Sequence, residues 1–491
     1  MNLSKSRYIS GLQCPKRLWY EANAYQEIPP FDAAAEERFA QGHEVGRLAL
    51  RLFPGGVEIA RDKRRWSTTA AATQRALAAR IPLYEASFVH EGGACRVDIL
   101  APVEGGEWDL LEVKSSTSVK KVHRADLAFQ TWVVRGAGVP VRRSCLVRID
   151  TSYVRQGPIE PERLFAIEDL TAEIEPLLDL VPSEVARQQQ IVAEPAPRAV
   201  AIGPHCTSPN GCPLVPVCWK DLPASSVLDL ARGGAKAWEL FHQGVREVAA
   251  IPAGVELSEL QRIQVEAARA GAARVDRAAI AELLDRLVYP VHYLDFETFQ
   301  LALPPFDGTR PWQQIPFQWS LHAVDAPGAL PRAAAFLADG DGDPRPAFLA
   351  SLRAALASHG SVVAFHDRFE RQRLAETAAA FPEHRDWIEA LTPRFVDLLE
   401  PFARFDYYHP EQNGSASLKA VLPVLGARGY DHLEVRDGTA AAREYLRLRG
   451  GDVEPGERER IRRALLDYCG RDTEGLVEIV AALARLVTGA S

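Results

Sequence analysis

The stretch CRVDILAPVEGGEWDLLEVK, residues 95–114, decides the architecture expected of the first part of the chain. Two apolar runs, 95–103 and 108–114, are joined by the turn-forming letters VEGGE, and runs of this length bounded by glycine are typical of paired strands. Helical patterns lie on both sides of this pair, up to about residue 185. The sequence therefore predicts an α/β domain here.

The remaining chain suggests two further parts. A stretch rich in Pro and Ala, 188–204, predicts a connector, and helical patterns follow at 224–287. A new domain is expected to open at Tyr289-Pro290, where the apolar strand 291–299 begins, and to close with a helix over about 457–487. We therefore expect an N-terminal domain at 1–222, a helical connector at 223–287 and a second α/β domain at 288–491.

Composition and charge narrow the class of protein. The chain has 491 residues, 47% of them hydrophobic, which is enough for two or three folded domains. Its net charge is -8, yet residues 1–150 carry 22 Lys and Arg against 17 Asp and Glu. A basic first third in an acidic chain suits a protein whose carboxylates hold metals while one face meets phosphates. Without a signal core or a spanning apolar stretch, we expect a cytoplasmic protein with no membrane partner.

The first candidate site lies in the two strands of the opening stretch. Glu112 and Lys114 are two residues apart on a strand and so emerge on the same side, while Asp98 lies in the strand before. Two carboxylates can hold a hard divalent cation while a lysine stabilises charge on an attacked phosphate. The alternative is a surface ion pair between Glu112 and Lys114.

These residues resemble the PD-(D/E)xK nucleases of the RecB-like branch, whose domain is restriction-endonuclease-like. The resemblance implies that the metal ligands and catalytic residues are His43 of QGHEVGRLA, Asp98, Glu112, Lys114 and Gln130 of DLAFQTWVV. In that scheme His43, Asp98 and Glu112 bind metal, and Lys114 and Gln130 are catalytic. Glu85 in LYEASF is a further candidate, with a solvated edge residue as the alternative.

A set of cysteines predicts a second kind of metal site. Cys206, Cys212 and Cys218 are separated by two equal gaps of five residues, and Cys14 lies far upstream in ISGLQCPKRLWY. A loop punctuated by Pro and Gly is mostly exposed, so three cysteines there favour a metal over a core, and the cytoplasm keeps thiols reduced. Structural zinc favours CxxC pairs, whereas a 4Fe-4S cubane tolerates wider spacing. We prefer the 4Fe-4S cluster and keep zinc as the alternative.

One early cysteine and three after the nuclease core is also the arrangement of the iron-sulfur members of the RecB-like branch, including the exonucleases of CRISPR adaptation. The resemblance implies a cluster that staples the ends of the domain together through Cys14, Cys206, Cys212 and Cys218. The three remaining cysteines are single residues in apolar contexts, and we expect them in the core: Cys95, Cys145 and Cys469.

A second acidic set begins in HYLDFETF, where Asp295 and Glu297 share one face of the expected strand. Such a pair at the end of an apolar strand is suited to bridging two divalent metals. Glu370 lies at the start of a helix in SVVAFHDRFE, and Tyr468 and Asp472 lie four residues apart on one face of the closing helix. Three elements thus contribute acidic residues in sequence.

This order, with YxxxD last, resembles the DnaQ-like DEDD exonucleases of the tyrosine subclass, whose fold is RNase H-like. The resemblance implies that two Mg or Mn ions are held by Asp295, Glu297, Glu370 and Asp472, and that Tyr468 positions or deprotonates the attacking water. Where the family has Asn and Asp in its second motif, this chain has His366 and Glu370. The region 286–491 looks closest to a bacterial domain of unassigned function that is commonly fused behind RecB-like nucleases.

Together these patterns predict a metal-dependent DNA nuclease in repair, recombination or defence. Its N-terminal domain would be endonuclease-like, and its C-terminal domain would be a 3′ to 5′ exonuclease. Two other functions stay open: a nucleic-acid-binding scaffold with one inactive nuclease fold, and an RNA-processing exonuclease. DNA is the more expected partner.

Overall fold

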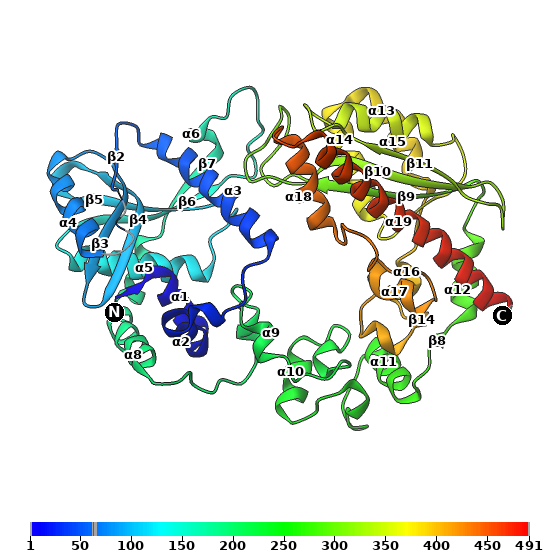
Figure 1. Ribbon diagram of the computed structural model, residues 1–491, viewed down its shortest axis with the longest axis horizontal. Helices are drawn as coiled ribbons and strands as arrows, with labels where there is room; N and C mark the ends of the chain where they lie inside the picture. The colour runs from blue at the N-terminus through cyan, green and yellow to red at the C-terminus, as the bar shows by residue number, and fades with distance from the viewer. Residues whose placement is uncertain (1, 61, 63–65, 490–491) are drawn as a thin grey trace. The chain divides into compact units, whose positions relative to one another are not determined.

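The computed structural model describes residues 2–60, 62 and 66–489, and the chain divides into two compact units (Figure 1). The first unit holds Met1–Asp221 together with Leu301–Gln313, and the second holds Leu222–Gln300 together with Gln314–Ser491. The expected connector, 223–287, therefore groups with the C-terminal unit. A short insertion, 301–313, groups with the N-terminal unit. Each unit mixes helices with a mixed sheet.

A seven-stranded sheet forms the middle of the first unit, in the order β2-β3-β4-β5-β6-β7, with β1 paired to β4 off this path. The strands are β1 Leu3–Ser4, β2 Val57–Glu58, β3 Leu83–His90, β4 Gly93–Pro102, β5 Trp108–Lys114, β6 Val141–Ile149 and β7 Phe165–Asp169. β4 is antiparallel to β3 and β5, whereas β5 and β6 are parallel. The strand pair expected from residues 95–114 is confirmed as β4 and β5.

Helices cover both faces of this sheet. The helices of this unit are α1 Lys5–Gln13, α2 Pro15–Asn23, α3 Ala33–Ala49, α4 Trp66–Ala76, α5 Lys121–Gly136, α6 Pro161–Leu164, α7 Thr171–Leu178, α8 Val181–Ala193 and α9 Val215–Cys218, with α5 and α3 packed on opposite faces of the sheet. Short 3-10 turns are η1 Tyr25–Glu27, η2 Leu50–Leu52, η3 Leu77–Ala79, η4 Glu104–Gly106 and η5 Pro204–Cys206. The expected connector begins later than 188, because 188–193 complete α8 with Gln188 and Ile191 buried.

The alternation of side chains along β5 places the first candidate site on one face of the sheet. Leu110 packs in the core shared with α5, and Leu111 packs in the core shared with Val45 of α3. Successive residues of a strand point to opposite faces. Glu112 and Lys114 therefore lie on the α5 side, with Leu110.

The regular alternation of side chains along β3 is interrupted at Glu85. Tyr84 packs in the α3 core and Ala86 in the α5 core, and Glu85 between them has a φ of 56°. That value belongs to the left-handed region, which a non-glycine residue rarely adopts in a strand. Asp98 lies on β4 between the partners of Tyr84 and Ala86, at the same distortion.

The second unit is built on a five-stranded sheet in the order β11-β10-β9-β12-β13. The strands are β9 Val291–Phe299, β10 Ile315–Val324, β11 Arg332–Leu337, β12 Val362–Ala364 and β13 Phe395–Asp397. β9, β10 and β11 are antiparallel neighbours, whereas β12 is parallel to β9 and to β13. A separate pair joins β8 Arg274–Val275 to β14 Tyr407–Tyr408. The strand expected at 291–299 is confirmed as β9.

Helices also cover both faces of this second sheet. On one face they are α13 Arg345–Ala355, α14 Arg368–Ala380 and α15 Arg385–Leu391, and on the other α18 Gly438–Arg449 and α19 Pro455–Thr488. The other helices of this unit are α10 Gly234–His242, α11 Glu259–Ala270, α12 Arg277–Asp285, α16 Glu400–Ala403 and α17 Leu418–Val424. The 3-10 turns are η6 Val227–Asp229, η7 Val248–Ala250, η8 Pro382–His384, η9 Thr392–Arg394 and η10 Pro410–Gln412. The closing helix expected at 457–487 is confirmed as α19.

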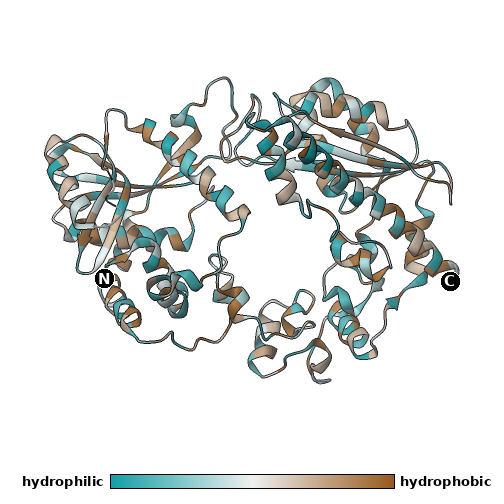
Figure 2. Ribbon diagram, viewed as in Figure 1, coloured by the Kyte–Doolittle hydropathy of each residue, from teal (hydrophilic) through white to brown (hydrophobic). Residues whose placement is uncertain are grey.

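The two faces of β9 have different roles. Leu294 and Phe296 pack in a core with residues of α13, α14 and α15. Asp295 and Glu297 alternate with them and therefore point to the opposite face, where α18 and α19 pack on β9. The long helix α19 carries both hydrophilic and hydrophobic residues (Figure 2). Among the described residues, no helix combines the length and apolarity needed to cross a membrane.

Candidate metal centres

Glu112 is the centre of a polar cluster in the first unit, and its carboxylate is almost fully buried. Its Oε1 accepts hydrogen bonds from Lys114 Nζ and Lys5 Nζ, each at 2.6 Å. Its Oε2 accepts from Lys5 Nζ at 2.8 Å and from Gln130 Nε2 at 2.9 Å. Donors from α1, β5 and α5 thus converge on one carboxylate.

Two aspartates flank this carboxylate. Asp98 Oδ2 accepts the backbone N–H of Val113 at 2.7 Å, and its Oδ1 lies 3.9 Å from Lys5 Nζ. Asp126 Oδ2 lies 3.1 Å from Lys114 Nζ, and Asp126 Oδ1 accepts from Gln130 Nε2 at 2.9 Å. The structure therefore brings together four of the five residues expected at this site and adds Lys5 and Asp126.

The charges of this cluster shift one another's protonation. Burial acts to raise the pKa of Glu112, but the ammonium groups of Lys114 and Lys5 hold that pKa below its usual range. Burial and the negative charge of Glu112 raise the pKa of Asp98 to about 7. Burial acts to lower the pKa of Lys114, but the carboxylates of Glu112 and Asp126 raise it above its usual value. Lys114 therefore stays charged near neutral pH.

His43 and Glu85 lie apart from these contacts. His43 is exposed on α3, whose buried residue Val45 packs on the opposite face of the sheet from Glu112. Glu85 is partly exposed and pairs with Arg96 at 3.4 Å. Their roles as metal ligands stay predictions. No contact among the described residues supports them.

The donor set of the Glu112 cluster fits a hard divalent cation. Asp98 and Glu112 offer carboxylate oxygens, which Mg²⁺ and Mn²⁺ prefer. Gln130 Oε1 is buried and has no hydrogen-bond partner among the described residues. An unpartnered buried acceptor costs free energy, so a bound cation or water next to it would be favourable.

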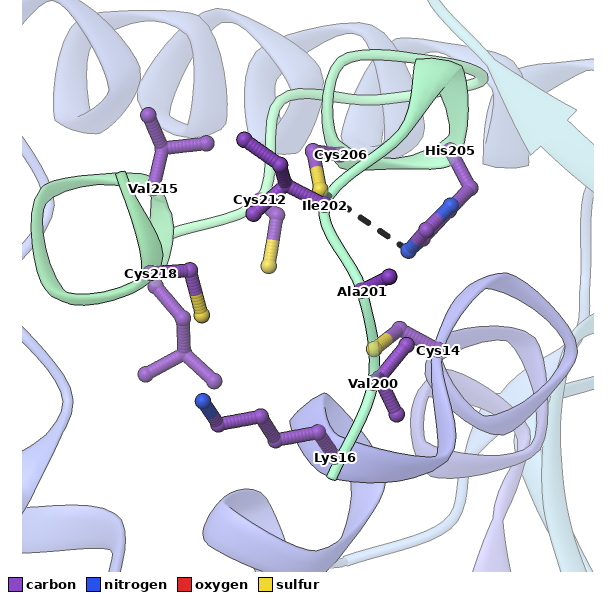
Figure 3. Close-up of a pocket in the computed structure, with 11 residues that line it drawn as sticks. Cys14, Lys16, Val200, Ala201, Ile202, His205, Cys206, Cys212, Val215 and Cys218 are labelled. Carbon is purple, nitrogen blue, oxygen red and sulfur yellow. Dashed lines mark hydrogen bonds between the residues drawn. The ribbon is translucent and has the colours of Figure 1, made fainter. Parts of the chain in front are cut away.

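The four expected cluster cysteines line one pocket in the first unit, together with Lys16 and His205 among others. Figure 3 shows the sulfur atoms of Cys14, Cys206, Cys212 and Cys218 around this pocket. Cys14 lies between α1 and α2, Cys206 ends η5, and Cys218 ends α9. Residues separated by about two hundred positions in the chain thus meet at one place.

Hydrogen bonds fix the two segments that carry these cysteines. Gln13 Nε2 donates to the carbonyl oxygens of His205 and Asn210 at 2.7 and 2.6 Å, which ties the end of α1 to the cysteine loop. The backbone N–H of Cys212 donates to Cys206 O at 2.9 Å inside that loop. Burial raises the pKa of the Cys212 thiol, so deprotonation needs a compensating cation.

Of the remaining cysteines, Cys95 and Cys145 are buried in the two cores of the first unit, as expected. Cys469 is buried as expected, but it has a polar neighbour as well. It lies on α19, and its Sγ donates toward Asp295 Oδ2 at 3.6 Å. Cys469 thus contacts the second acidic site.

Asp295, Glu297 and Cys469 form a compact donor group in the second unit. Their ligand atoms all lie within 4.8 Å of one another, and among residues 2–60, 62 and 66–489 theirs is the one group of three or more His, Cys, Asp or Glu that does so. Burial and the neighbouring carboxylate of Asp472 raise the pKa of Asp295 well above its usual range. Burial and the charges of Asp295 and Asp472 do the same for Glu297.

Asp472 joins this group from α19. It is buried, and its Oδ1 accepts a hydrogen bond from the hydroxyl of Tyr430. The ring of Tyr430 lies 6.0 Å from the ring of Tyr468, between centroids. Burial raises the pKa of Asp472 to about 6, although the hydrogen bond from Tyr430 acts in the other direction. Burial and the charge of Asp472 raise the pKa of Tyr468, which therefore keeps its proton.

Glu370 completes the set from the first turn of α14. Its side chain is buried, and its Oε2 has no hydrogen-bond partner among the described residues. Burial and the charge of Asp295 raise the pKa of Glu370 well above its usual range. Lys419 on α17 is the cation that acts to lower the pKa of Glu297, and its Nζ lies 5.5 Å from the ring centroid of Tyr430.

The second acidic set therefore fits divalent metal. Buried carboxylates with raised pKa values are electrostatically frustrated, because each charge disfavours the others. A cation would relieve that repulsion and satisfy the unpartnered oxygen of Glu370. Asp397 shapes the turn after β12, because its Oδ1 accepts the backbone N–H groups of His366 and Leu399 at 2.8 and 2.9 Å.

The sequence patterns missed Lys5, Tyr430 and the polar contact of Cys469, and they gave Asp126 no role of its own. Asp126 had a usable signal, because it lies four residues before Gln130 and so on the same face of a helix. Lys5 lies 107 residues before Glu112, and no local pattern links them. Tyr430 likewise lies in a loop 42 residues before Asp472.

A family model described as a domain of unknown function (DUF2779) matches residues 292–417. The matched part contains Asp295, Glu297 and Glu370 and ends before Tyr430, Tyr468 and Asp472. No curated protein and no solved structure matches the chain.

Proposed function

We propose that the chain is a metal-dependent nuclease that hydrolyses phosphodiester bonds, with its main site in the second unit. The observation that carries the proposal is the convergence of four buried or partly buried carboxylates, Asp295, Glu297, Glu370 and Asp472, from β9, α14 and α19. Clustered carboxylates without a partner cation are costly, and divalent metals are the cations that nucleases use.

The second unit is proposed to act as a 3′ to 5′ exonuclease of the DEDD tyrosine type in an RNase H-like domain. Its mixed five-stranded sheet, with the acidic pair on the central strand, is compatible with that fold. Two bound Mg or Mn ions would stabilise charge on the attacking and leaving oxygens. Asp295, Glu297, Glu370 and Asp472 hold the ions, and Tyr468 orients the attacking water through its protonated hydroxyl.

The first unit is proposed to carry a second nuclease site in a restriction-endonuclease-like domain. Asp98 and Glu112 hold a divalent cation, and Lys114 stabilises negative charge that develops on the attacked phosphate. Gln130 orients Glu112 through the hydrogen bond of 2.9 Å. Asp126 in turn positions the ammonium group of Lys114 through the ion pair of 3.1 Å.

The four cysteines of the first unit are proposed to hold a 4Fe-4S cluster. Structural zinc favours closely spaced CxxC pairs, which these four cysteines lack, whereas a cubane tolerates wider spacing and one distant ligand. The cluster would join the start of the chain to the loop 206–218. Cys14 lies between α1 and α2, and Cys206, Cys212 and Cys218 lie in that loop.

DNA is the proposed substrate, in a cytoplasmic role in repair, recombination or defence. The excess of basic residues over 1–150 supports a polyanionic partner. An RNA-processing enzyme would use the same hydrolysis of phosphodiester bonds. A nucleic-acid-binding scaffold would bind its partner without hydrolysing it.

One assay separates these functions. The anaerobically purified full chain is incubated with end-labelled single- and double-stranded DNA and RNA, with Mn²⁺ and then with EDTA. The proposal expects DNA to be degraded with Mn²⁺ and to stay intact with EDTA. Degradation of RNA alone would establish the processing role, and binding without degradation would establish the scaffold.

A further inference from the structure

Lys5 holds a fixed place in the first unit. It is the first residue of α1, directly after the cap Ser4, whose hydroxyl accepts the N–H of Arg7. The preceding residue Leu3 is buried and pairs with Gly93 of β4, so the chain before Lys5 is part of the sheet. The position of the Lys5 backbone is therefore set by the core of the unit.

The ammonium group of Lys5 lies between Glu112 and Asp98. It contacts both oxygens of Glu112, at 2.6 and 2.8 Å, and lies 3.9 Å from Asp98 Oδ1. Lys114 differs in its partners. Its Nζ contacts only Oε1 of Glu112 and forms a second ion pair with Asp126 Oδ2 at 3.1 Å. Lys5 is thus the cation placed between the two carboxylates that the proposed function assigns to metal.

We propose that Lys5 is a built-in competitor of the divalent metal at this site. In the metal-free protein it neutralises Glu112 and Asp98, and it leaves them when the metal binds. This inference rests on the proposed N-terminal metal site and names the residue that sets its affinity.

Electrostatics and side-chain length support this exchange. A divalent cation held by both Glu112 and Asp98 would need the place between them that the Lys5 ammonium occupies, and two cations repel each other strongly at such a distance. The side chain of Lys5 is long and flexible and is 26% exposed, so it has a path to solvent. Lys114 has a second partner in Asp126 and can stay in place while metal binds.

The test is a Mn²⁺ titration of the full chain, followed by the loss of the free-ion signal in electron paramagnetic resonance. All variants carry Asp295→Asn and Glu297→Gln, which disable the metal site of the second unit. In this background, adding Glu112→Gln identifies binding at the first unit. Adding Lys5→Met should lower the dissociation constant on the order of tenfold or more, since the competitor is gone.

Lys114→Met is the matched control, because it removes the same charge at the same distance from Oε1 of Glu112. The proposal expects Lys114→Met to tighten Mn²⁺ binding much less than Lys5→Met. Equal effects of the two substitutions would mean that loss of any positive charge near Glu112 tightens Mn²⁺ binding. That result would overturn the proposal.

A second measurement does not depend on the folding of the Lys5→Met variant. Acetylation of Lys5 by a water-soluble acylating reagent is followed by mass spectrometry in the background chain, with and without Mn²⁺. Release from the carboxylates should speed acetylation of Lys5 on the order of tenfold, while Lys16 serves as the internal reference.

The failures are distinguishable. If Glu112→Gln changes no Mn²⁺ binding, the N-terminal metal site of the proposed function is absent and the inference falls with it. If Glu112→Gln abolishes binding but neither the affinity nor the acetylation of Lys5 responds, the metal site stands and the competitor role of Lys5 is overturned.

Discussion

Tyr430 donates its phenolic hydrogen bond to Oδ1 of Asp472, deep in the second unit. The tyrosine comes from the loop between α17 and α18, whereas the aspartate lies on α19. Asp472 is one of the proposed metal ligands, so its orientation in the metal-free protein depends on Tyr430. Tyr468, which the sequence pattern singled out, lies beside this pair.

Tyr430→Phe should destabilise the metal-free protein by about 1–3 kcal/mol, because the buried carboxylate of Asp472 loses the hydrogen bond that Tyr430 donates. Denaturant unfolding in EDTA measures this change. Tyr468→Phe is the matched control and should cost less stability but slow end-trimming by about 10²-fold, as expected for a lost proton-transfer group. Indistinguishable unfolding curves for the two variants would contradict this division of roles.

The free energy of unfolding of the metal-free protein should decrease as pH rises, because Asp472 becomes ionised. Burial raises its pKa to about 6 from an ordinary value of 3.8. A carboxyl whose folded pKa is raised stabilises the fold below its ordinary pKa, and that stability is lost as pH rises through the folded pKa. From about pH 4 to about pH 6 in EDTA, the wild type should therefore lose more stability than Asp472→Asn. Parallel pH profiles of the two proteins would argue against a charged cluster.

Metal should reverse this trend. Mn²⁺ binds the ionised carboxylates, so saturating Mn²⁺ should raise the melting temperature of the wild type near neutral pH. Glu370→Gln removes one ligand and should lose most of that increase, while its melting temperature in EDTA stays unchanged or rises because repulsion is relieved. Differential scanning calorimetry checks both values. An equal rise with Mn²⁺ in the variant would remove Glu370 from the metal site.

Cys212→Ser should remove the iron-sulfur cluster. Freshly purified wild type should be brown and contain iron and acid-labile sulfide, and the variant should lose both along with stability. Cys145→Ser is the matched control, because Cys145 is buried in a core away from the pocket. Stoichiometric zinc without sulfide in anaerobic wild-type protein would replace the cluster with the zinc alternative.

Lys114→Ala should abolish the cutting that belongs to the first unit without unfolding it. Loss of an electrostatic donor to the attacked phosphate typically costs about 10²-fold or more in rate. The comparison is made in a chain whose second site carries Asp295→Asn, with Asp98→Ala as a companion and the exposed Arg163→Ala as the control. Full activity in both Lys114→Ala and Asp98→Ala would make the first site non-catalytic.

The strands that carry the candidate sites were predictable because their signals are local. Two apolar runs around VEGGE sufficed for β4 and β5, and the alternation in 291–299 placed Asp295 and Glu297 on one face of β9. Spacing by four residues likewise placed Tyr468 and Asp472 on one face of α19. Periodicity follows directly from backbone geometry, so one sequence is enough to read it.

Contacts between distant segments could not be read in the same way. Lys5 reaches Glu112 because β1 pairs with β4, and a pairing of two residues leaves no pattern in the sequence. The grouping of 301–313 with the first unit and of 223–287 with the second depends on tertiary packing. His43 could be matched to a motif, yet its exposure on α3 is set by which face of that helix the core selects.

The most direct test of the account follows end-labelled single-stranded DNA, incubated with Mn²⁺ and either wild-type protein or Asp295→Asn, on a sequencing gel. We predict a ladder of progressively shorter products from the wild type and none from the variant, with both proteins equally folded by circular dichroism. An intact substrate with Mn²⁺-loaded wild type, or the same ladder from Asp295→Asn, would contradict it.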